Sequence, residues 1–130
     1  MINNQPLNGV RVLDLTNIIM GPFATQLLGD LGADIIKVES PEGDLMRDVG
    51  ISKSEKMSSV FLGTNRNKRS IVLNLKKKSH KLVLWKLIAK SDIFIHNMRP
   101  SKLDNLGFSH KKILKKNKKI IFTALYGYGF

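Results

Sequence analysis

The chain has 130 residues, of which 42% are hydrophobic and 25% charged, a composition typical of one globular domain. It contains no cysteine, which excludes disulfides and cysteine-ligated zinc, and its apolar stretches are too short to span a membrane, so we expect a soluble, cytoplasmic protein. The 22 Lys and Arg residues against 10 Asp and Glu give a net charge of +12, which favours an anionic partner or, equally, lysine-rich helix faces in solvent.

The first forty residues predict a strand–helix–strand unit. The β-branched segment 10–15 is typical of a buried strand, and apolar residues at helical spacing predict a helix over 22–31 that begins at Pro22 and ends at Gly32. Segment 34–39 predicts the second strand, so the unit has the length of one βαβ crossover.

The middle of the chain predicts a long loop followed by a second crossover. Residues 40–60 are rich in Gly, Ser and Lys and indicate an exposed excursion, with a short helix near 59–63. Alternating apolar residues predict a strand over 69–75, followed by a basic amphipathic helix over 79–89 and a strand over 92–96.

The last part predicts two short helices and a fifth strand. Ser101 is expected to cap a helix that runs to Leu106, Ser109 to cap the next one, and 119–125 to form the strand. Strands that alternate with helices throughout indicate an α/β fold with a mostly parallel sheet covered by helices on both faces. Because the chain stops just after a strand, we expect residues 1–130 to be the N-terminal part of a larger domain.

Several local patterns suggest a binding site, although none is specific by itself. The turn 17–22 lies where α/β folds bind anions, but it lacks the G-x-G-x-x-G fingerprint of dinucleotide sites. The cationic cluster 65–70 fits either a phosphate grip or a solvated turn, with the turn slightly favoured. Asn97, after the fourth predicted strand, fits either a ligand contact or an ordinary turn asparagine.

The titratable residues do not form a recognisable catalytic or metal site. The three histidines, His80, His96 and His110, are not at metal-ligand spacing, so we expect no metal. Of the carboxylates, Asp14 is expected to hold neighbouring loops, and Asp44 and Asp48 to lie in a mobile loop. None of them is predicted to be a nucleophile.

A series of short segments, taken together and in order, resembles the opening of CoA-transferase family III. These segments are PLNGVRVLDL at 6–15, Gly21-Pro22, LGADIIKVE at 31–39, Gly43-Asp44, NRNKRSI at 65–71, Ser91-Asp92-Ile93, Asn97-Met98-Arg99-Pro100, Leu106-Gly107-Phe108, Ile120-Ile121 and Gly127-Tyr128-Gly129. The resemblance covers Pro6 to Phe130. It implies a Rossmann-like domain that binds coenzyme A and, in the whole protein, a smaller domain and an interlocked homodimer.

The resemblance also implies an activity. Family members include formyl-CoA and crotonobetainyl-CoA transferases, which move CoA from an acyl-CoA to a carboxylic acid acceptor through an Asp acyl anhydride. They also include α-methylacyl-CoA racemases, which use acid–base chemistry instead. The family's Asp nucleophile falls beyond Phe130, so we expect the 130 residues alone to be inactive. A stand-alone CoA-binding or nucleotide-binding remnant is the other alternative, and nucleic acid is not expected as a partner because aromatic residues are few.

Carried onto this sequence, the resemblance places the coenzyme A site in four segments. They comprise Asn17, Ile18, Ile19 and Met20; Leu73, Asn74, Leu75 and Lys76; Asn97, Met98 and Arg99; and Asn105. Asn105 and Ser40 stand where family members often carry arginine, and Lys37, Lys76 or Arg99 is expected to supply the missing positive charge.

Overall fold

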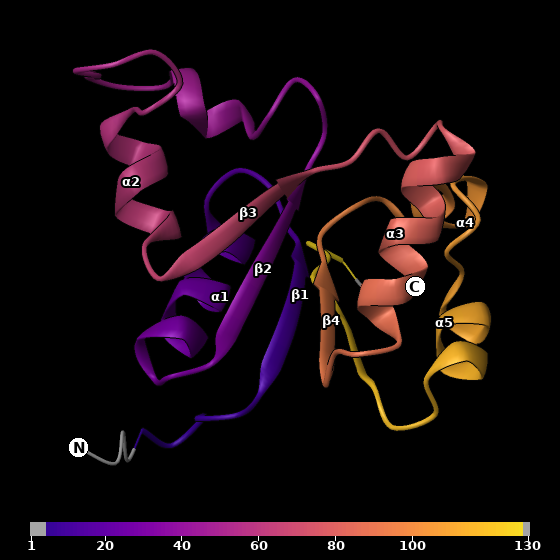
Figure 1. The fold of residues 1–130 in the computed structure, drawn as a ribbon. Helices are drawn as coiled ribbons and strands as arrows, with labels where there is room; N and C mark the ends of the chain where they lie inside the picture. The colour runs from indigo at the N-terminus through magenta and orange to yellow at the C-terminus, as the bar shows by residue number, and fades with distance from the viewer. Residues whose placement is uncertain (1–4, 129–130) are drawn as a thin grey trace.

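The computed structural model describes residues 5–128, and its five strands run parallel in one sheet of order β3–β2–β1–β4–β5 (Figure 1). The strands are β1 (Arg11–Leu15), β2 (Asp34–Glu39), β3 (Lys68–Val72), β4 (Ile93–His96) and β5 (Ile121–Ala124). The helices are α1 (Met20–Asp30), the 3₁₀ turn η1 (Leu45–Asp48), α2 (Ser59–Asn65), α3 (Lys78–Ile88), α4 (Pro100–Asn105) and α5 (His110–Lys116). The predicted α/β fold with a parallel sheet is therefore confirmed.

The strand order places the crossover helices on opposite faces of the sheet. The chain moves from β1 outward to β3 and then returns across the sheet to β4, and right-handed crossovers in these two directions lie on opposite sides. Figure 1 shows α3 in front of β4, whereas α1 lies behind β1 and β2. Neighbouring residues of β1 accordingly enter different cores: Leu13 packs with Phe94 on one side, and Val12 packs with Ile35 on the other.

Most predicted elements lie where the sequence indicates, and the differences occur at their ends. Helix α1 begins at Met20 rather than Pro22, because the Phe23 amide already bonds to the Ile19 carbonyl at 2.8 Å. Helix α4 begins at Pro100, with Arg99 at the N-cap, so the prediction that Ser101 caps it is wrong. Ser109 does cap α5, accepting from the Lys112 amide at 3.4 Å.

Strand β3 is shifted toward the N-terminus relative to its predicted range of 69–75. The Leu73 amide makes a 2.8 Å bond to the Glu39 carbonyl, and the chain then leaves the sheet. The Asn74 amide donates to His80 Nδ1 at 2.9 Å, while the Asn74 side chain accepts from the Lys76 amide at 3.0 Å. These bonds turn the chain into α3, so Leu73 and Leu75 belong to a loop rather than to the strand.

The excursion between β2 and β3 is held at both ends, while residues 48–57 are exposed as the sequence predicts. The Arg47 guanidinium lies 3.7 Å from the centre of the Phe61 ring, which joins η1 to α2. Ser58 is buried, caps α2 and donates to the Met46 carbonyl. Within residues 5–128, no helix is long and apolar enough to cross a membrane.

Candidate functional site

A cleft of about 420 Å³ opens at the carboxyl edge of the sheet, where the strand order reverses between β1 and β4. Chain segments after β1, β2, β3 and β4 meet there, which is where open α/β sheets bind ligands. The lining residues are Leu15, Thr16, Asn17, Val38, Glu39, Ser40, Pro41, Glu42, Gly43, Asp44, Leu73, Asn74, Leu75, Lys76, Met98, Lys102 and Leu106. The volume falls within the range of small-molecule sites.

The cleft brings together six of the twelve predicted site residues. From three of the four predicted segments, it is lined by Asn17, Leu73, Asn74, Leu75, Lys76 and Met98. The remaining six, Ile18, Ile19, Met20, Asn97, Arg99 and Asn105, are not among its lining residues. The expectation that the turns after β1, β3 and β4 share one rim of a parallel sheet agrees with this geometry.

The lining of the cleft carries charges of both signs. Lys76, after β3, and Lys102, on α4, contribute ammonium groups. Hydrogen bonds from Ser40 and its own backbone lower the pKa of Glu42, in the segment after β2, and the charge of Lys76 acts in the same direction. The two lysines are the lining groups that attract a negatively charged part of a ligand.

Asp44 is the centre of a buried network beneath the cleft, and the prediction that it lies in a mobile loop is wrong. Its carboxylate lies 2.8 Å from Lys37 Nζ, and the side chains of both residues are at most 1% exposed. It also accepts from the amides of Ile18 at 3.2 Å and Met46 at 3.0 Å. Charge pairing at this depth is effective because water is excluded and both groups make further hydrogen bonds.

Lys37 therefore cannot replace the positive charge of the missing arginines at positions 40 and 105, contrary to the expectation from the sequence. Besides pairing with Asp44, its ammonium group donates to the Thr16 carbonyl at 2.9 Å. A buried lysine with these partners stabilises the cleft from below and is not available to a ligand. The other two residues considered for that role, Lys76 and Arg99, are exposed.

A second buried pair, Asp14 with Lys68, secures α1 against the sheet. Asp14 accepts from Thr25 Oγ1 at 2.5 Å and from the Thr16 amide at 2.8 Å, and Lys68 Nζ lies 3.2 Å away. Burial lowers the pKa of Lys68 to about 8, although the Asp14 carboxylate acts in the opposite direction. The expectation that Asp14 holds neighbouring segments is confirmed.

The cationic cluster 65–70 forms ion pairs within the protein. Arg66 lies 2.6 Å from Asp30, and Arg69 lies 2.6 Å from Asp34. With Lys68 bound to Asp14, each cation of the cluster already has a carboxylate partner. The cluster thus ties β3 to its neighbours and is not a free phosphate grip.

Asn97 joins the turns after β1 and β4. Its side-chain oxygen accepts from the Asn17 amide at 3.0 Å, and its side-chain nitrogen donates to the Asn17 carbonyl at 2.8 Å. Both polar atoms of the Asn97 side chain are thus used within the protein, which favours the turn interpretation of this residue. The pair fixes the separation of the two turns that line the cleft.

The turn after β1 contains a residue in an unfavourable conformation. Ile18 has φ of 75°, in the left-handed region that β-branched residues avoid at a cost of roughly 1–3 kcal/mol. Its side chain is 46% exposed, so core packing does not force this conformation. The turn is held instead by two hydrogen bonds: one from the Ile18 amide to Asp44, and one from the Asn17 amide to the Asn97 side chain.

The histidines do not assemble a metal site. Within residues 5–128, no group of three or more His, Cys, Asp or Glu side chains is placed to hold a metal ion. His96 is buried among Phe94, Phe122 and Tyr126, and burial lowers its pKa. Neither of its ring nitrogens makes a hydrogen bond of ordinary geometry, although the nearby Met98 backbone favours the charged form slightly.

Sequence reasoning missed Gly43, Asp44 and Lys102 as residues of the site. The signal for Asp44 was present: Lys37 stands in an otherwise apolar strand pattern, and a buried lysine requires a buried carboxylate nearby. The signal for Lys102 was weaker, because it is one of many lysines and only the position of α4 brings it to the cleft.

Comparison with known proteins identifies the family. The model of CoA-transferase family III matches residues 7–130, and the chain belongs to this family. Succinyl-CoA:glutarate CoA-transferase from Mus musculus is 44% identical over 96% of this chain and 29% of its own length. Formyl-CoA:oxalate CoA-transferase from Streptomyces coelicolor is 41% identical over 96% of this chain and 30% of its own length.

Solved structures support the same assignment. A CAIB/BAIF family protein from Brucella suis superposes with a TM-score of 0.92 at 36% identity, over 97% of this chain and 34% of that one. A hypothetical protein from Mycobacterium tuberculosis superposes with a TM-score of 0.88 at 34% identity, over 96% of this chain and 34% of that one. The chain thus spans about a third of the length of the solved relatives it matches.

Proposed function

We propose that this chain is the coenzyme-A-binding part of a CoA-transferase, which moves CoA between an acyl-CoA thioester and a carboxylic acid. The observation that carries the proposal is the shared cleft, where the turns after β1, β3 and β4 meet as the family resemblance requires. The relatives from Mus musculus and Streptomyces coelicolor are named CoA-transferases, which favours transfer over racemisation.

The proposed chemistry proceeds in three steps. An Asp carboxylate outside these 130 residues attacks the thioester carbonyl, the carbon–sulfur bond breaks, and CoA leaves as the thiolate while an acyl anhydride forms. An incoming carboxylate then attacks the Asp carbonyl of the anhydride, which releases the original acid and forms a new anhydride. The retained thiolate attacks the acyl carbonyl of this new anhydride, which gives the new thioester and restores the Asp carboxylate. Splitting the exchange in this way replaces one difficult step with easier ones.

The residues of this chain would bind and orient the CoA portion. Lys76 and Lys102 would take its phosphates, since ammonium groups attract phosphate and both line the cleft. Met98, Leu73 and Leu106 would contact the less polar part. Asp14 and Asp44 are ion-paired and buried, so neither serves as the nucleophile.

We further propose that residues 1–130 form the N-terminal part of a Rossmann-like domain, and that the whole protein is an interlocked homodimer. The exposed face of α1 supports the packing of further polypeptide there. Met20 is 78% exposed, and Phe23, Leu27 and Leu31 are 44–46% exposed at spacings of one helical turn. The polypeptide outside this segment is the occupant that we propose for this face.

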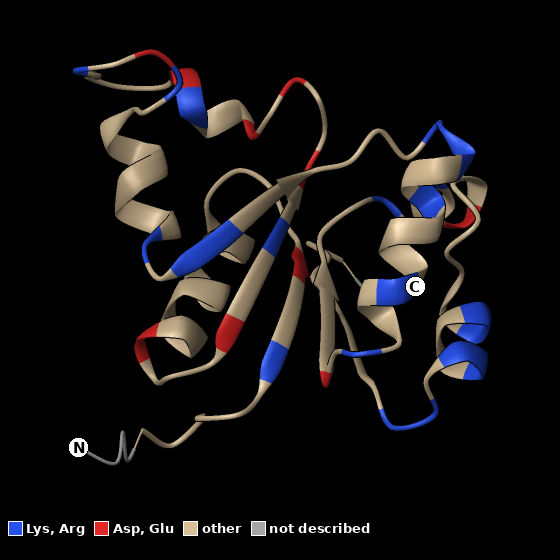
Figure 2. Cartoon of the chain, viewed as in Figure 1, with Lys and Arg blue, Asp and Glu red and all other residues tan. Residues whose placement is uncertain are grey.

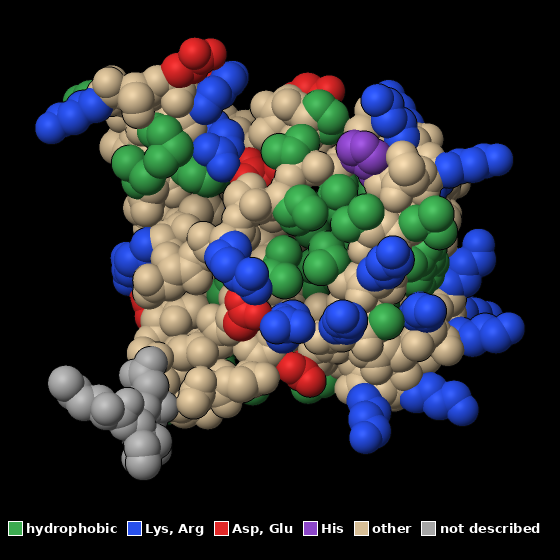
Figure 3. All heavy atoms as spheres, in the orientation of Figure 1, with side chains coloured by type: hydrophobic (Ala, Val, Ile, Leu, Met, Phe, Trp, Pro, Cys, Tyr) green, Lys and Arg blue, Asp and Glu red, His purple; other side chains and the backbone are tan. Residues whose placement is uncertain are grey.

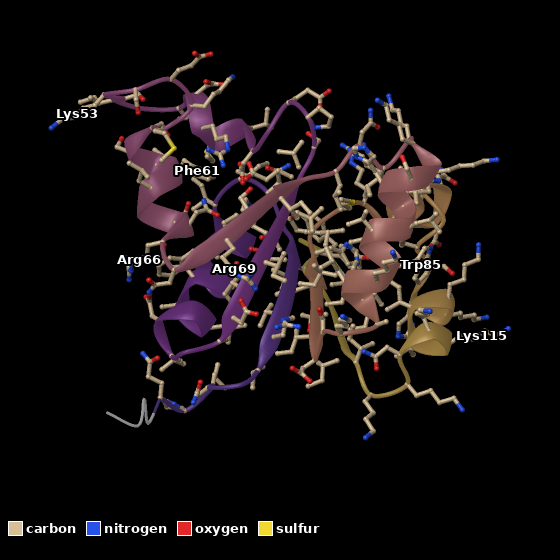
Figure 4. All side chains as sticks on the ribbon, in the orientation of Figure 1. Lys53, Phe61, Arg66, Arg69, Trp85 and Lys115 are labelled. Carbon is tan, nitrogen blue, oxygen red and sulfur yellow. The ribbon has the colours of Figure 1, made fainter. Side chains whose placement is uncertain are left out.

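The cleft assignment is tested by calorimetric titration of the full polypeptide with coenzyme A and with pantetheine, which lacks the phosphates. Replacing Lys76 and Lys102 together with Gln should weaken CoA binding roughly tenfold to a hundredfold, the cost of two phosphate contacts. Pantetheine binding should change little. Lys53→Gln, at the far tip of the loop before α2 (Figure 4), is the matched control and should bind both ligands normally.

The proposed reaction is tested by incubating the full polypeptide with a CoA thioester and a free carboxylic acid and following thioester exchange. Exchange is the expected result. Racemisation at the carbon next to the thioester without exchange would support the racemase alternative, and CoA binding with neither reaction would support a stand-alone binding protein.

A further inference from the structure

The turn from Thr16 to Met20 is held from below by two charged side chains. Lys37 Nζ donates to the Thr16 carbonyl at 2.9 Å, and the Ile18 amide donates to Asp44 at 3.2 Å. The hydrogen-bond network also sets the orientation of the Asn17 side chain, whose nitrogen then lies 2.8 and 3.1 Å from the two Asp44 oxygens. Three consecutive residues of the turn are thus bound to one buried ion pair.

The ion pair requires a carboxylate at position 44. One oxygen of Asp44 accepts from the amides of Ile18 and Met46, while the other faces Lys37 Nζ at 2.8 Å. A carboxylate has acceptor sites for all these donors, whereas an amide of the same shape offers one acceptor and would turn N–H groups toward a donor. Lys37 places a positive charge beside this carboxylate, which offsets the cost of burying it in a residue that is only 2% exposed.

We propose that Asp44, neutralised by Lys37, is a positioning residue that holds the turn Thr16–Met20 in the conformation that binds the CoA thioester. The inference rests on the proposed function. Asp44 acts on the ligand indirectly, through the turn. Its hydrogen bond with the Ile18 amide holds Ile18 at φ of 75°, a conformation that Ile18 would leave without this bond. Asn17, fixed on its other side by Asn97, then presents a single surface to the cleft.

The first test is Asp44→Asn in the full polypeptide, with CoA binding measured by calorimetry. CoA affinity should fall roughly tenfold to a hundredfold, the effect of a misplaced binding element. The matched control is Asp48→Asn, which removes an exposed carboxylate at the other end of η1, the short helix that Asp44 caps, and should leave CoA affinity unchanged. In the exchange assay, KM for the thioester should rise more than kcat falls, because Asp44 does not touch the reacting atoms.

The second test separates positioning from general loss of structure. Glycine adopts positive φ without steric cost, so Ile18→Gly should let the turn keep its conformation without the bond to Asp44. Ile18→Gly should therefore restore most of the affinity lost in Asp44→Asn, while changing the affinity of the wild type much less. A coupling of this kind is what a double-mutant cycle measures.

A third variant covers the case in which Asp44→Asn does not fold. Replacing the pair together, with Lys37→Met and Asp44→Leu, removes both buried charges, and such replacements are often neutral for stability. This variant should also bind CoA weakly and should also be rescued by Ile18→Gly. Folded variants that bind CoA as tightly as the wild type, or a loss that Ile18→Gly leaves untouched, would overturn the proposal. Absence of CoA binding by the wild type would instead overturn the proposed function.

Discussion

The Glu39 carboxylate holds the end of β2 in place beside the cleft. Arg47 binds both of its oxygens, at 2.6 and 2.7 Å, and the Ser70 hydroxyl and the Asp44 amide donate at 2.5 and 3.1 Å. Burial alone would raise the pKa of Glu39, but these donors lower it to about 2. The ionised form is therefore part of the folded structure.

This residue predicts how stability depends on pH. Because the pKa of Glu39 is about 2 in the folded chain and 4.5 ordinarily, its contribution is complete above pH 4.5 and is lost as the pH falls toward 2. The loss should be about 3 kcal/mol. Denaturant unfolding between pH 6 and pH 2 would measure it against Glu39→Gln, whose profile should be flatter, and Glu55→Gln, an exposed control that should follow the wild type. Identical profiles for Glu39→Gln and wild type would contradict the prediction.

At the same scale, the sequence indicated the position of the site better than its chemistry. Asn17 and Lys76 follow predicted strands, and parallel strands bring their carboxyl ends to one edge, so their meeting was predictable. The partnership of Asp44 with Lys37 was not, because it depends on how the excursion after β2 folds back beneath the turn after β1. Local sequence patterns do not predict a contact between two loops that are far apart in the chain.

At the scale of elements, regular segments were predictable and the excursion 40–60 was not. Hydrophobic periodicity reports burial of a strand or helix face, and it located every strand of the described sheet to within a few residues. The excursion has little such periodicity, and polar contacts hold it: Arg47 over Phe61, and Ser58 bonded to Met46 and Phe61. Such contacts leave no periodic pattern in the sequence, so they can be identified only in the folded structure.

Ser58 provides a prediction for this element. Its hydroxyl accepts from the Phe61 amide at 3.1 Å as the N-cap of α2 and donates to the Met46 carbonyl, and the residue is fully buried. Ser58→Ala should lower the free energy of unfolding by about 1–2 kcal/mol, since it removes a cap and one of the two hydrogen bonds to the Met46 carbonyl, leaving only the one from the Val49 amide. Thermal unfolding would measure the loss. Ser59→Ala, one residue on and exposed, is the matched control, and an equal effect of both substitutions would rule out a capping role.

At the scale of the whole molecule, the positive charge is confined to one part of the chain. Residues 76–119 contain 14 Lys and Arg against 2 Asp, a net of +12, while the remaining 8 cations and 8 carboxylates cancel. In the described residues, all ion pairs join positions between 11 and 69. Figure 2 shows the unpaired cations on α3, α5 and the adjoining turns, and Figure 3 shows them projecting from that side of the molecule.

This distribution predicts fast, salt-dependent capture of a polyanionic ligand. A surface of one sign of charge beside a binding cleft concentrates ligands of the opposite sign and can raise association rates by about tenfold or more at low salt. Replacing Lys111, Lys112, Lys115 and Lys116 with Gln should therefore slow CoA association severalfold and reduce its salt dependence. The dissociation rate should stay the same, because none of these lysines lines the cleft.

Stopped-flow measurement of CoA association between 20 and 500 mM salt would test this prediction on the full polypeptide. Lys115 points away from the body on one side of the molecule, and Lys53 lies at the tip of a loop on the other (Figure 4), so Lys53→Gln controls for charge alone. The rates of wild type and the four-lysine variant should converge at high salt, where the field is screened. If the variant instead loses affinity through faster dissociation at all salt concentrations, these lysines act by contact with the ligand and not through their field.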